Sequence, residues 1–345
     1  MIVSDVLAEA DCEQVLLVHD RAARATLLVA VHDTRLGPAH GGIRRSAYPD
    51  LEAAARDVVL LARAMTWKCA LAEVPAGGGK CVLLDHPGLD RTLAYRAVGR
   101  AVAQLGGRFF TGPDVGTVDA DLREVAAETS FVAGPAAAGE NGPGDLAEAT
   151  ASGVHAALQA LAERLGRSVD GLRILLQGLG ATGARLATRL ANAGARLLVS
   201  DVRAEAVAAV VAATGAEPIA PDRVLATPCD VFAPCALGGV LTLAAARTLP
   251  ALGVCGAANN VFAEPAAARE LHRRGVLAVP DFVANAGALI QGATWHLTGV
   301  RVGEARLQRI AATTGELLDR ARTQDVPPIE LALDLAQERL QRRGA

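Results

Sequence analysis

The stretch Leu172-Arg-Ile-Leu-Leu-Gln177, followed at once by Gly178-Leu-Gly180-Ala-Thr-Gly183, predicts the fold of the C-terminal part of this chain. The pattern indicates a buried strand, a GxGxxG turn and a helix over residues 184–193. In such a turn the first glycine permits the tight bend, the second lets the backbone approach a pyrophosphate, and the third lets helix and strand pack closely. A glycine-rich structural turn is the alternative, but the flanking strand and helix are those that dinucleotide binding requires.

A second predicted strand, 197–200, ends beside Asp201, at the spacing where an acidic residue meets the adenosine ribose. Its charge would repel a 2′-phosphate and favours NAD, while Arg203 keeps NADP open as a second option. From about residue 145 strands and helices alternate, which predicts a parallel, doubly wound sheet, because parallel neighbours need a crossover. Further strands are expected at 217–219, 230–233, 254–256 and 276–279.

The N-terminal part, residues 1–140, predicts a mixed α/β domain. The expected strands are 15–18, 26–31, 81–84 and 108–111, and the expected helices are 51–66 and 92–105. The first helix follows Asp50 as its N-cap and brings Lys68 to its C-terminal end. The segment 134–144 is rich in Gly, Pro and Ala and marks the change of domain.

The composition indicates a globular protein with a small-molecule partner. With 345 residues, 51% of them hydrophobic, the chain is long enough for two domains with separate cores. Its formal net charge is −3 and it has no basic stripe, which argues against nucleic acid as a partner. The six cysteines show no spacing typical of zinc ligands, so we expect no metal site and reduced thiols.

We expect no membrane span and no export signal. The stretch 282–300 lacks Asp, Glu, Lys and Arg, but Asn285, Gln291, His296 and its glycines argue against a span. The start, Met1-Ile-Val-Ser-Asp5, carries an acid where a signal peptide needs a basic region. The expected location is therefore the cytoplasm.

Only two of the 34 basic residues are lysines, Lys68 and Lys80. They lie in Met65-Thr-Trp-Lys68 and Gly77-Gly-Gly-Lys80. An arginine keeps its proton in a protein, whereas a buried lysine can shift its pKa and act as a base. The sequence therefore favours chemistry at these two positions, with codon bias and two chance survivors as the alternative.

Glycine runs and one acid complete the candidate site. Gly41-Gly42 and Gly77-Gly-Gly79 indicate a backbone that passes close to a neighbour, and together they suggest a tight cleft for a small ligand. The second run lacks the remaining residues of a phosphate loop, so we set nucleotide hydrolysis aside. Asp114 follows a strand and is a candidate second proton carrier, with a turn-forming role as the alternative.

Further motifs follow one another along the chain. They are Leu36-Gly-Pro-Ala-His-Gly-Gly42, Asp114-Val-Gly-Thr117, Ala233-Pro-Cys-Ala-Leu-Gly238, Gly256-Ala-Ala-Asn-Asn260 and Pro280-Asp-Phe-Val-Ala-Asn-Ala-Gly287. With the lysine motifs and the GxGxxG, this set resembles the leucine, phenylalanine and valine dehydrogenases of the glutamate dehydrogenase superfamily over nearly the whole chain. The resemblance implies a substrate and oligomerisation domain (1–140, with the C-terminal helices of about 320–345 packed on it), a Rossmann-type NAD domain (141–320) and an active site in the cleft.

The resemblance also implies a role for each matching residue. Lys68 is similar to the cation that holds the substrate carboxylate, aided by Gly41 and Gly42, and Lys80 is similar to the general base. A lysine is a base near neutral pH only if its ammonium form is disfavoured, which burial and a neighbouring cation achieve. Asp114 would carry protons to and from the departing amine.

On the cofactor side, Asn260 is similar to the residue that fixes substrate and nicotinamide together, and Thr150 to the threonine near the carboxamide. A simple turn is the alternative for Asn259-Asn260. The expected cofactor-binding residues are Gly178, Gly180, Ala181, Thr182, Gly183, Asp201, Thr150 and Asn260.

Four residues correspond to the family's side-chain pocket, namely His40, Gly112, Leu289 and Gly292. Gly112 is similar to the phenylalanine enzymes, where removal of a methyl leaves space for a ring, and Gly292 would enlarge the pocket further. His40 departs from the usual small or aliphatic residue. It would stack on an aromatic substrate, hydrogen-bond a polar one, or face away. Further departures from the family pattern are Ile43 and Ala288.

The sequence therefore predicts an NAD-dependent L-amino acid dehydrogenase that reversibly converts a large apolar or aromatic substrate, phenylalanine first, to the 2-oxo acid and ammonia. The alternatives are a leucine or valine dehydrogenase, an enzyme of this fold for an unusual or larger, tryptophan-like substrate, and a non-catalytic NAD-binding protein. Retention of Lys68, Lys80 and Asp114 argues against the last. Members of the family are homo-oligomers, so we expect one here, with the N-terminal domain as the contact surface.

Overall fold

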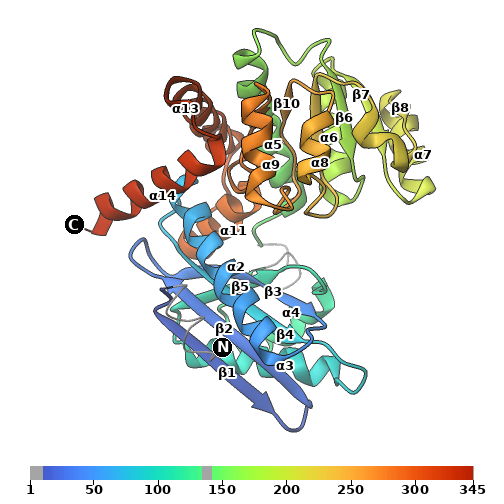
Figure 1. Ribbon diagram of the computed structural model, residues 1–345. Coiled ribbons are helices and arrows are strands. Elements are labelled where there is room, and N and C mark those ends of the chain that lie inside the picture. The colour runs from blue at the N-terminus through green and yellow to red at the C-terminus, as the bar shows by residue number, and fades with distance from the viewer. Residues whose placement is uncertain (1–10, 134–141, 345) are drawn as a thin grey trace. The chain divides into compact units, whose positions relative to one another are not determined.

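The computed structural model describes residues 11–133 and 142–344 (Figure 1). The chain divides into two compact units, which are described separately below. The first comprises Met1–Gly144, Leu289–Arg301 and Ala336–Ala345, and the second comprises Asp145–Ala288 and Val302–Leu335. Most of the segment where we expected the change of domain, 134–144, lies outside the described residues.

The first unit is built on a five-stranded mixed sheet. Its strands are β1 (Gln14–Asp20), β2 (Ala25–Asp33), β3 (Ala39–Ser46), β4 (Gly77–Leu84) and β5 (Phe109–Pro113). They lie in the order β1-β2-β4-β3-β5, with β2 antiparallel to β1 and β4, and β3 parallel to β4 and β5. The four strands expected here are confirmed. The structure adds β3, and it starts β4 at the glycines that precede Lys80.

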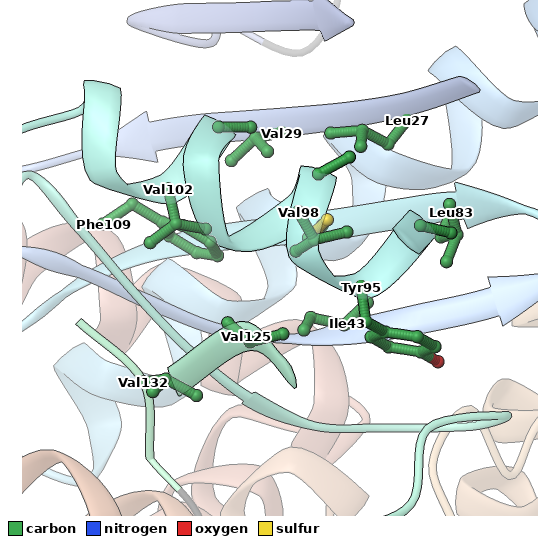
Figure 2. Close-up of a cluster of buried hydrophobic side chains, with 14 of the residues drawn as sticks. Leu27, Val29, Ile43, Leu83, Tyr95, Val98, Val102, Phe109, Val125 and Val132 are labelled. Atoms are coloured by element: carbon green, nitrogen blue, oxygen red, sulfur yellow. The ribbon is translucent and has the colours of Figure 1, made fainter. Parts of the chain in front are cut away.

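Helices pack on both faces of this sheet. They are α2 (Leu51–Leu71), α3 (Arg91–Gln104), α4 (Asp119–Ala126) and the part of α11 (Gly287–Thr298) from Leu289 onward. On one face, α2 packs on β2 and β4 through a cluster that includes Leu28, Val58 and Val82. On the other face, α3 and α4 enclose a larger cluster around Tyr95 and Phe109 (Figure 2). The sheet therefore separates two apolar layers.

Helix α2 is longer than the sequence predicted. It begins after Asp50, whose carboxylate accepts the N–H of Ala53 at 2.7 Å, as expected for an N-cap. It continues past Thr66 to Leu71, so Lys68 lies in its last turn. In the part of the chain that the structure describes, no helix, α11 included, is long and apolar enough to cross a membrane.

The second unit contains a six-stranded parallel sheet, as predicted. Its strands are β6 (Arg173–Gln177), β7 (Arg196–Ser200), β8 (Glu217–Pro218), β9 (Val231–Pro234), β10 (Gly253–Val254) and β11 (Leu277–Ala278). They lie in the order β11-β10-β9-β6-β7-β8. The chain runs outward from β6 through β7 and β8, then resumes at β9 on the other side of β6. Such a reversal creates a crevice at the carboxyl ends of the strands, where ligands of doubly wound sheets bind.

The crossovers of this sheet are mostly helical. The helices of the second unit are α5 (Leu146–Arg164), α6 (Ala181–Asn192), α7 (Ala204–Thr214), the 3₁₀ helix η2 (Pro221–Ala226), α8 (Leu243–Thr248), α9 (Pro265–Arg273), α10 (Asp281–Ala284), α12 (Glu304–Leu307), α13 (Arg309–Gln324) and the start of α14 (Pro328–Gly344). Helix α6 directly follows the GxGxxG turn, in agreement with the sequence.

The C-terminal helices divide between the two units. Helix α13 packs along α5, where Arg164 binds Asp319 at 2.9 Å, and both helices belong to the second unit. Only the end of α14 lies in the first unit, where Arg339 donates to the carbonyl of Leu71 at 2.7 Å. Each C-terminal segment is thus assigned to the unit of the helix that it contacts, α13 to that of α5 and the end of α14 to that of α2.

Candidate active site

The strand register of the first unit places the candidate residues on one face of the sheet. His40 on β3 pairs with Gly78 on β4 and with Phe110 on β5, so the three form one row. Lys80 lies two residues beyond Gly78, and side chains two apart on a strand share a face. Asp114 stands directly after β5 with the same parity as Phe110. This face is the one covered by α2.

Lys80 and Asp114 form the centre of the site. Nζ of Lys80 lies 2.6 Å from Oδ2 of Asp114, and both side chains are largely buried. Nε of Arg44 approaches the same oxygen at 3.4 Å. Burial favours the neutral carboxyl, but Lys80 and then Arg44 outweigh it, and the pKa of Asp114 lies below its ordinary value. Asp114 is therefore a carboxylate between two cations, with a direct path for a proton to Lys80.

Arg44 was missed by the sequence reasoning. It lies two residues after Gly42 on β3, so its side chain shares the face of Lys80. Asp57 holds it from α2 at 3.2 Å, and the hydroxyl of Tyr48 donates to the same Asp57 carboxylate at 2.6 Å. The sequence could have indicated Arg44, because it follows His40 and Gly42 at alternate positions of one strand.

Lys68 lies in the last turn of α2, and this end of the helix packs on β4. A methyl group on Gly78 would lie 2.1 Å from the backbone nitrogen of Thr66, and Cys69 Sγ contacts the carbonyl of Gly77 at 3.2 Å. The last turns of α2 thus rest directly on β4, which only glycines allow. The space beside Gly77-Gly-Gly79 is filled by the protein, whereas we expected it to border a ligand cleft.

The second glycine pair is also tightly enclosed. A methyl group on Gly41 would lie 1.7 Å from the carbonyl oxygen of Gly79, and one on Gly42 would lie 2.4 Å from that of Pro113. Glycine is required at both positions by the neighbouring strands. Their aid to Lys68 in holding a carboxylate stays a prediction.

His40 lies on the same face as Lys80, so it does not face away from the site. Its ring stacks on Phe110, with centroids 5.0 Å apart and planes 5° from parallel, and Nδ1 contacts the carbonyl of Pro38 at 2.9 Å. Burial lowers the pKa of His40 to about 4. The ring is therefore neutral at physiological pH.

Helix α11 contributes one side of the same region. Leu289, Gly292 and His296 are spaced by three and four residues and share a helix face. The His296 ring lies 4.8 Å from Phe110 and 5.4 Å from His40, between centroids. Phe110 and His296 were both missed by the sequence reasoning, although the helical spacing from Leu289 and Gly292 pointed to His296.

Gly112 does not leave an open space. A methyl group there would lie 2.8 Å from the carbonyl oxygen of Ala133, because the 131–133 segment pairs beside β5 at Thr111. Close packing against Ala133 therefore explains why a glycine stands at position 112. Its predicted enlargement of the pocket has no support from this geometry.

In the second unit, the three glycines of the GxGxxG turn differ in their surroundings. Gly178 has φ +96°, and a methyl group there would touch Ala236. A methyl group on Gly183 would lie 2.0 Å from the carbonyl oxygen of Gly178. A methyl group on Gly180 would meet nothing within 4 Å. Helix α6 starts at Ala181 without a side-chain cap, so the N–H groups of its first turn are available. This open, capless start fits a pyrophosphate.

Asp201 lies beside this turn at the end of β7. Its carboxylate accepts the N–H of Leu179 at 2.6 Å and binds Arg203 at 3.2 Å. Burial raises the pKa of Asp201, but the contacts with Arg203 and Leu179 outweigh burial, and the pKa lies below its ordinary value. Two exposed apolar side chains, missed by the sequence reasoning, stand at the same end of the sheet: Val202 after β7 and Leu237 after β9.

Asn260 lies in a turn whose backbone is bound by Asp281, the first residue of α10. Its φ is +51°, and its N–H donates to Asp281 at 2.7 Å. Asn285 donates to the side chain of Asn259 at 2.7 Å. Asn259-Asn260 is thus a turn pair, and its fixed shape presents an exposed Asn260 side chain. Thr150 lies on α5, close to the backbone of Gly287.

Comparison with known proteins assigns the chain to a family. Two family models match, "Glu/Leu/Phe/Val dehydrogenase, dimerisation domain" over residues 17–131 and "Glutamate/Leucine/Phenylalanine/Valine dehydrogenase" over residues 199–294. A leucine dehydrogenase of Geobacillus stearothermophilus is 36% identical over 96% of this chain and 91% of its own length. The chain belongs to the Glu/Leu/Phe/Val dehydrogenase family.

Other relatives in this family differ in substrate. A phenylalanine dehydrogenase of Caldalkalibacillus thermarum is 36% identical over 96% of this chain and 92% of its own. The crystal structure of an L-tryptophan dehydrogenase from Nostoc punctiforme is 34% identical, with a TM-score of 0.85 over 99% of both chains. The protein is thus an amino acid dehydrogenase, an oxidoreductase with a nicotinamide cofactor, and the enzyme prediction is confirmed. The relatives leave its amino acid open.

Proposed function

We propose that this Glu/Leu/Phe/Val dehydrogenase catalyses the NAD-dependent, reversible oxidative deamination of an L-amino acid with a large apolar or aromatic side chain, phenylalanine being the first candidate. The observation that carries the proposal is the buried contact of 2.6 Å between Lys80 Nζ and Asp114 Oδ2 beside the His40–Phe110 stack. It joins a proton-transfer pair to an aromatic surface on one sheet face.

The residues of the first unit then divide the work. Lys68 would hold the substrate carboxylate, and the nicotinamide supplies the hydride acceptor when bound. Loss of hydride leaves the substrate as an iminium, and Lys80 Nζ would remove a proton from the water that adds to its carbon. Asp114 Oδ2 would pass a proton to the departing amine and recover it along the same short contact.

The second unit supplies the residues that would hold NAD. The phosphates would lie at Gly178, Gly180, Ala181, Thr182 and Gly183, where the turn is open. Asp201 would accept the ribose hydroxyls, which favours NAD. Thr150 and Asn260 would hold the nicotinamide end, and the apolar side chains of Val202 and Leu237 would contact the adenine.

A second candidate is an enzyme for a larger, tryptophan-like side chain. The buried His40 favours it, since the residue brings a polar ring into the pocket. A leucine or valine dehydrogenase is the remaining alternative. We also propose a homo-oligomer formed through the first unit, because the family model that matches residues 17–131 describes a dimerisation domain.

The test is NADH formation from NAD⁺ at alkaline pH with phenylalanine, tyrosine, tryptophan, leucine, valine and glutamate. Lys80→Ala serves as the matched control, since it removes the proposed base and leaves the cofactor turn intact. We expect turnover of an aromatic substrate that this variant lacks. Turnover of glutamate alone, or none at all while NAD binds, would overturn the proposal.

A further inference from the structure

His40 carries one buried nitrogen without a partner. Its Nδ1 contacts the carbonyl of Pro38 at 2.9 Å, and a carbonyl only accepts hydrogen bonds, so the ring proton sits on Nδ1. Nε2 is then a bare acceptor. It is buried, the residue is only 4% exposed, and no hydrogen-bond partner reaches Nε2 within the described residues.

A bare acceptor in a buried site is uncommon and usually has a reason. Nδ1 of the buried His32 contacts the hydroxyl of Thr66 at 2.9 Å, whereas both ring nitrogens of His296, whose ring lies beside His40, are also buried without a partner in the described residues. Burial also keeps His40 neutral, with a pKa of about 4, so Nε2 keeps its lone pair at any pH where the enzyme would work. The missing partner must therefore be a donor.

The position of His40 on the sheet relates it to the proposed chemistry. His40 and Phe110 form one row, and Lys80, Gly42 and Gly112 stand two residues further along their strands. Two residues of strand span ~6.6 Å. Gly42 and Gly112 carry no side chain between these two rows, and the backbone carbonyls of Pro113 and Ala133 lie 2.4 and 2.8 Å from their methyl positions. An amino acid whose amine lies at Lys80 would therefore bring the far end of a long side chain to the His40 row.

The surroundings of His40 favour a flat ring. Phe110 stacks on it, Phe131 meets Phe110 edge-on at 5.3 Å and 77°, and His296 packs against both His40 and Phe110. Aromatic rings prefer such stacked and edge-on neighbours. The group of rings thus combines aromatic surface with buried imidazole nitrogens that lack a partner, and His40 Nε2 is the one whose neighbours fix it as an acceptor.

We propose that this dehydrogenase selects an aromatic amino acid whose ring carries its own donor, an indole N–H or a phenol O–H, and that His40 Nε2 accepts that hydrogen bond. The inference rests on the proposed function and narrows it from aromatic side chains in general to donor-bearing ones. Phenylalanine fills the same space but leaves Nε2 unpaired, so it is the poorer substrate. Sites built around a substrate hydrogen bond reject analogues that lack it more strongly than sites that sense size alone.

The experiment compares kcat/KM for tyrosine, tryptophan, phenylalanine and 4-fluorophenylalanine in the wild-type enzyme. 4-Fluorophenylalanine resembles tyrosine in size but has no donor. We expect tyrosine or tryptophan to exceed both donor-free substrates by ~10-fold or more. Which of the two leads identifies the ring. This arm needs no variant, so it holds even if a substitution at His40 prevents folding.

A second arm removes the acceptor. His40→Leu keeps an apolar side chain of similar reach, and the advantage of the donor-bearing substrate should fall to within ~2-fold of phenylalanine, since no acceptor remains to reward it. His19→Leu, at an exposed histidine on β1, is the control and should keep the wild-type ratio. The inference is overturned if kcat/KM for the donor-bearing substrate does not exceed that for phenylalanine in the wild type. It is also overturned if His40→Leu leaves the ratio of these two values unchanged.

The outcomes also separate this inference from the proposed function. Good turnover of phenylalanine, leucine or valine without any advantage for tyrosine or tryptophan would retain the dehydrogenase and remove the donor selection. Absence of turnover with every amino acid would instead remove the proposed function itself.

Discussion

Lys80 and Asp114 meet at 2.6 Å from two strands that are not neighbours, because β3 lies between β4 and β5 and Gly42 on β3 carries no side chain that would separate them. The contact joins a cation that can lose a proton to a carboxylate that can receive one. This pairing gives the site its proposed chemistry, and it leads to the first two predictions.

Lys80→Ala should lower kcat by ~100-fold or more, since general base catalysis contributes at least this much. NAD affinity should stay near that of the wild type, because Lys80 belongs to the first unit and the cofactor turn to the second. Stopped-flow rates and NAD titration by fluorescence measure the two effects. Arg96→Ala, at a surface ion pair with Glu124, is the control. More than a few per cent of residual rate contradicts the role.

Asp114→Asn tests the charge of the pair through pH and stability. The folded pKa of Asp114 lies below its ordinary value, so its ion pairs contribute stability that is complete above the unfolded pKa of ~3.9 and is lost as pH falls through the folded pKa. At pH 7 the variant should lose about 3 kcal/mol in free energy of unfolding, since it leaves the buried Lys80 without its carboxylate partner, while Arg44 keeps Asp57. Urea unfolding at pH 7 and pH 3 should show this difference shrinking in acid. An equal difference at both pH values speaks against the assignment.

Lys68→Ala should raise KM for the amino acid at least ~10-fold with a smaller change in kcat, because a carboxylate clamp contributes mainly to binding. Steady-state kinetics with a saturating concentration of NAD⁺ give both constants. Arg21→Ala, at an exposed position of the same unit, controls for the loss of one positive charge. An unchanged KM removes the role assigned to Lys68.

Arg203→Ala addresses the choice of cofactor. Arg203 binds Asp201 at 3.2 Å, and its loss leaves the carboxylate uncompensated where a 2′-phosphate would lie. We expect any turnover with NADP⁺ to fall at least ~10-fold and turnover with NAD⁺ to change less than ~3-fold, because charge repulsion affects only the phosphate. The ratio of kcat/KM for NADP⁺ to that for NAD⁺, in the wild type and in the variant, measures this change in cofactor preference. A gain in NADP⁺ use after the substitution would refute the predicted repulsion by Asp201.

Gly78→Ala should destabilise the protein by about 2 kcal/mol through overpacking, since the new methyl group would lie 2.1 Å from Thr66 N. Gly303→Ala is the matched control, because a methyl group there meets nothing within 4 Å. Thermal unfolding of both variants gives the comparison. Equal melting temperatures would show that α2 moves away from β4 without cost.

The sequence predicted those features that depend on local patterns. The GxGxxG turn, its strand and helix, and Asp201 at the next strand follow from short-range spacing, and all were found where expected. Strand β3 and the start of β4 were missed, because glycines are poor strand formers. What makes Gly77 to Gly79 a strand is tertiary, namely the close approach of α2 and Phe109, and no local pattern records that contact.

The pocket residues show the same limit. His40 was identified as a departure from the family pattern, but its unpaired Nε2 depends on where Pro38 and Phe110 lie. His296 comes from a segment far along the chain, and only the structure shows that its ring meets His40. The rarity of lysine and the position after a strand indicated Lys68, Lys80 and Asp114, and the family resemblance implied their roles. The structure supplied Arg44 as the second cation at the Asp114 carboxylate.

The tight enclosure of the glycines in β3 and β4 restricts how this enzyme could be redesigned. Substitutions at Gly41, Gly42 or Gly78 would destabilise the protein, since each methyl position is already occupied by backbone. A library aimed at new amines for chiral synthesis should instead vary the side chains of His40, Phe110 and the α11 face. There the scaffold can change its preference without losing the strand that carries Lys80.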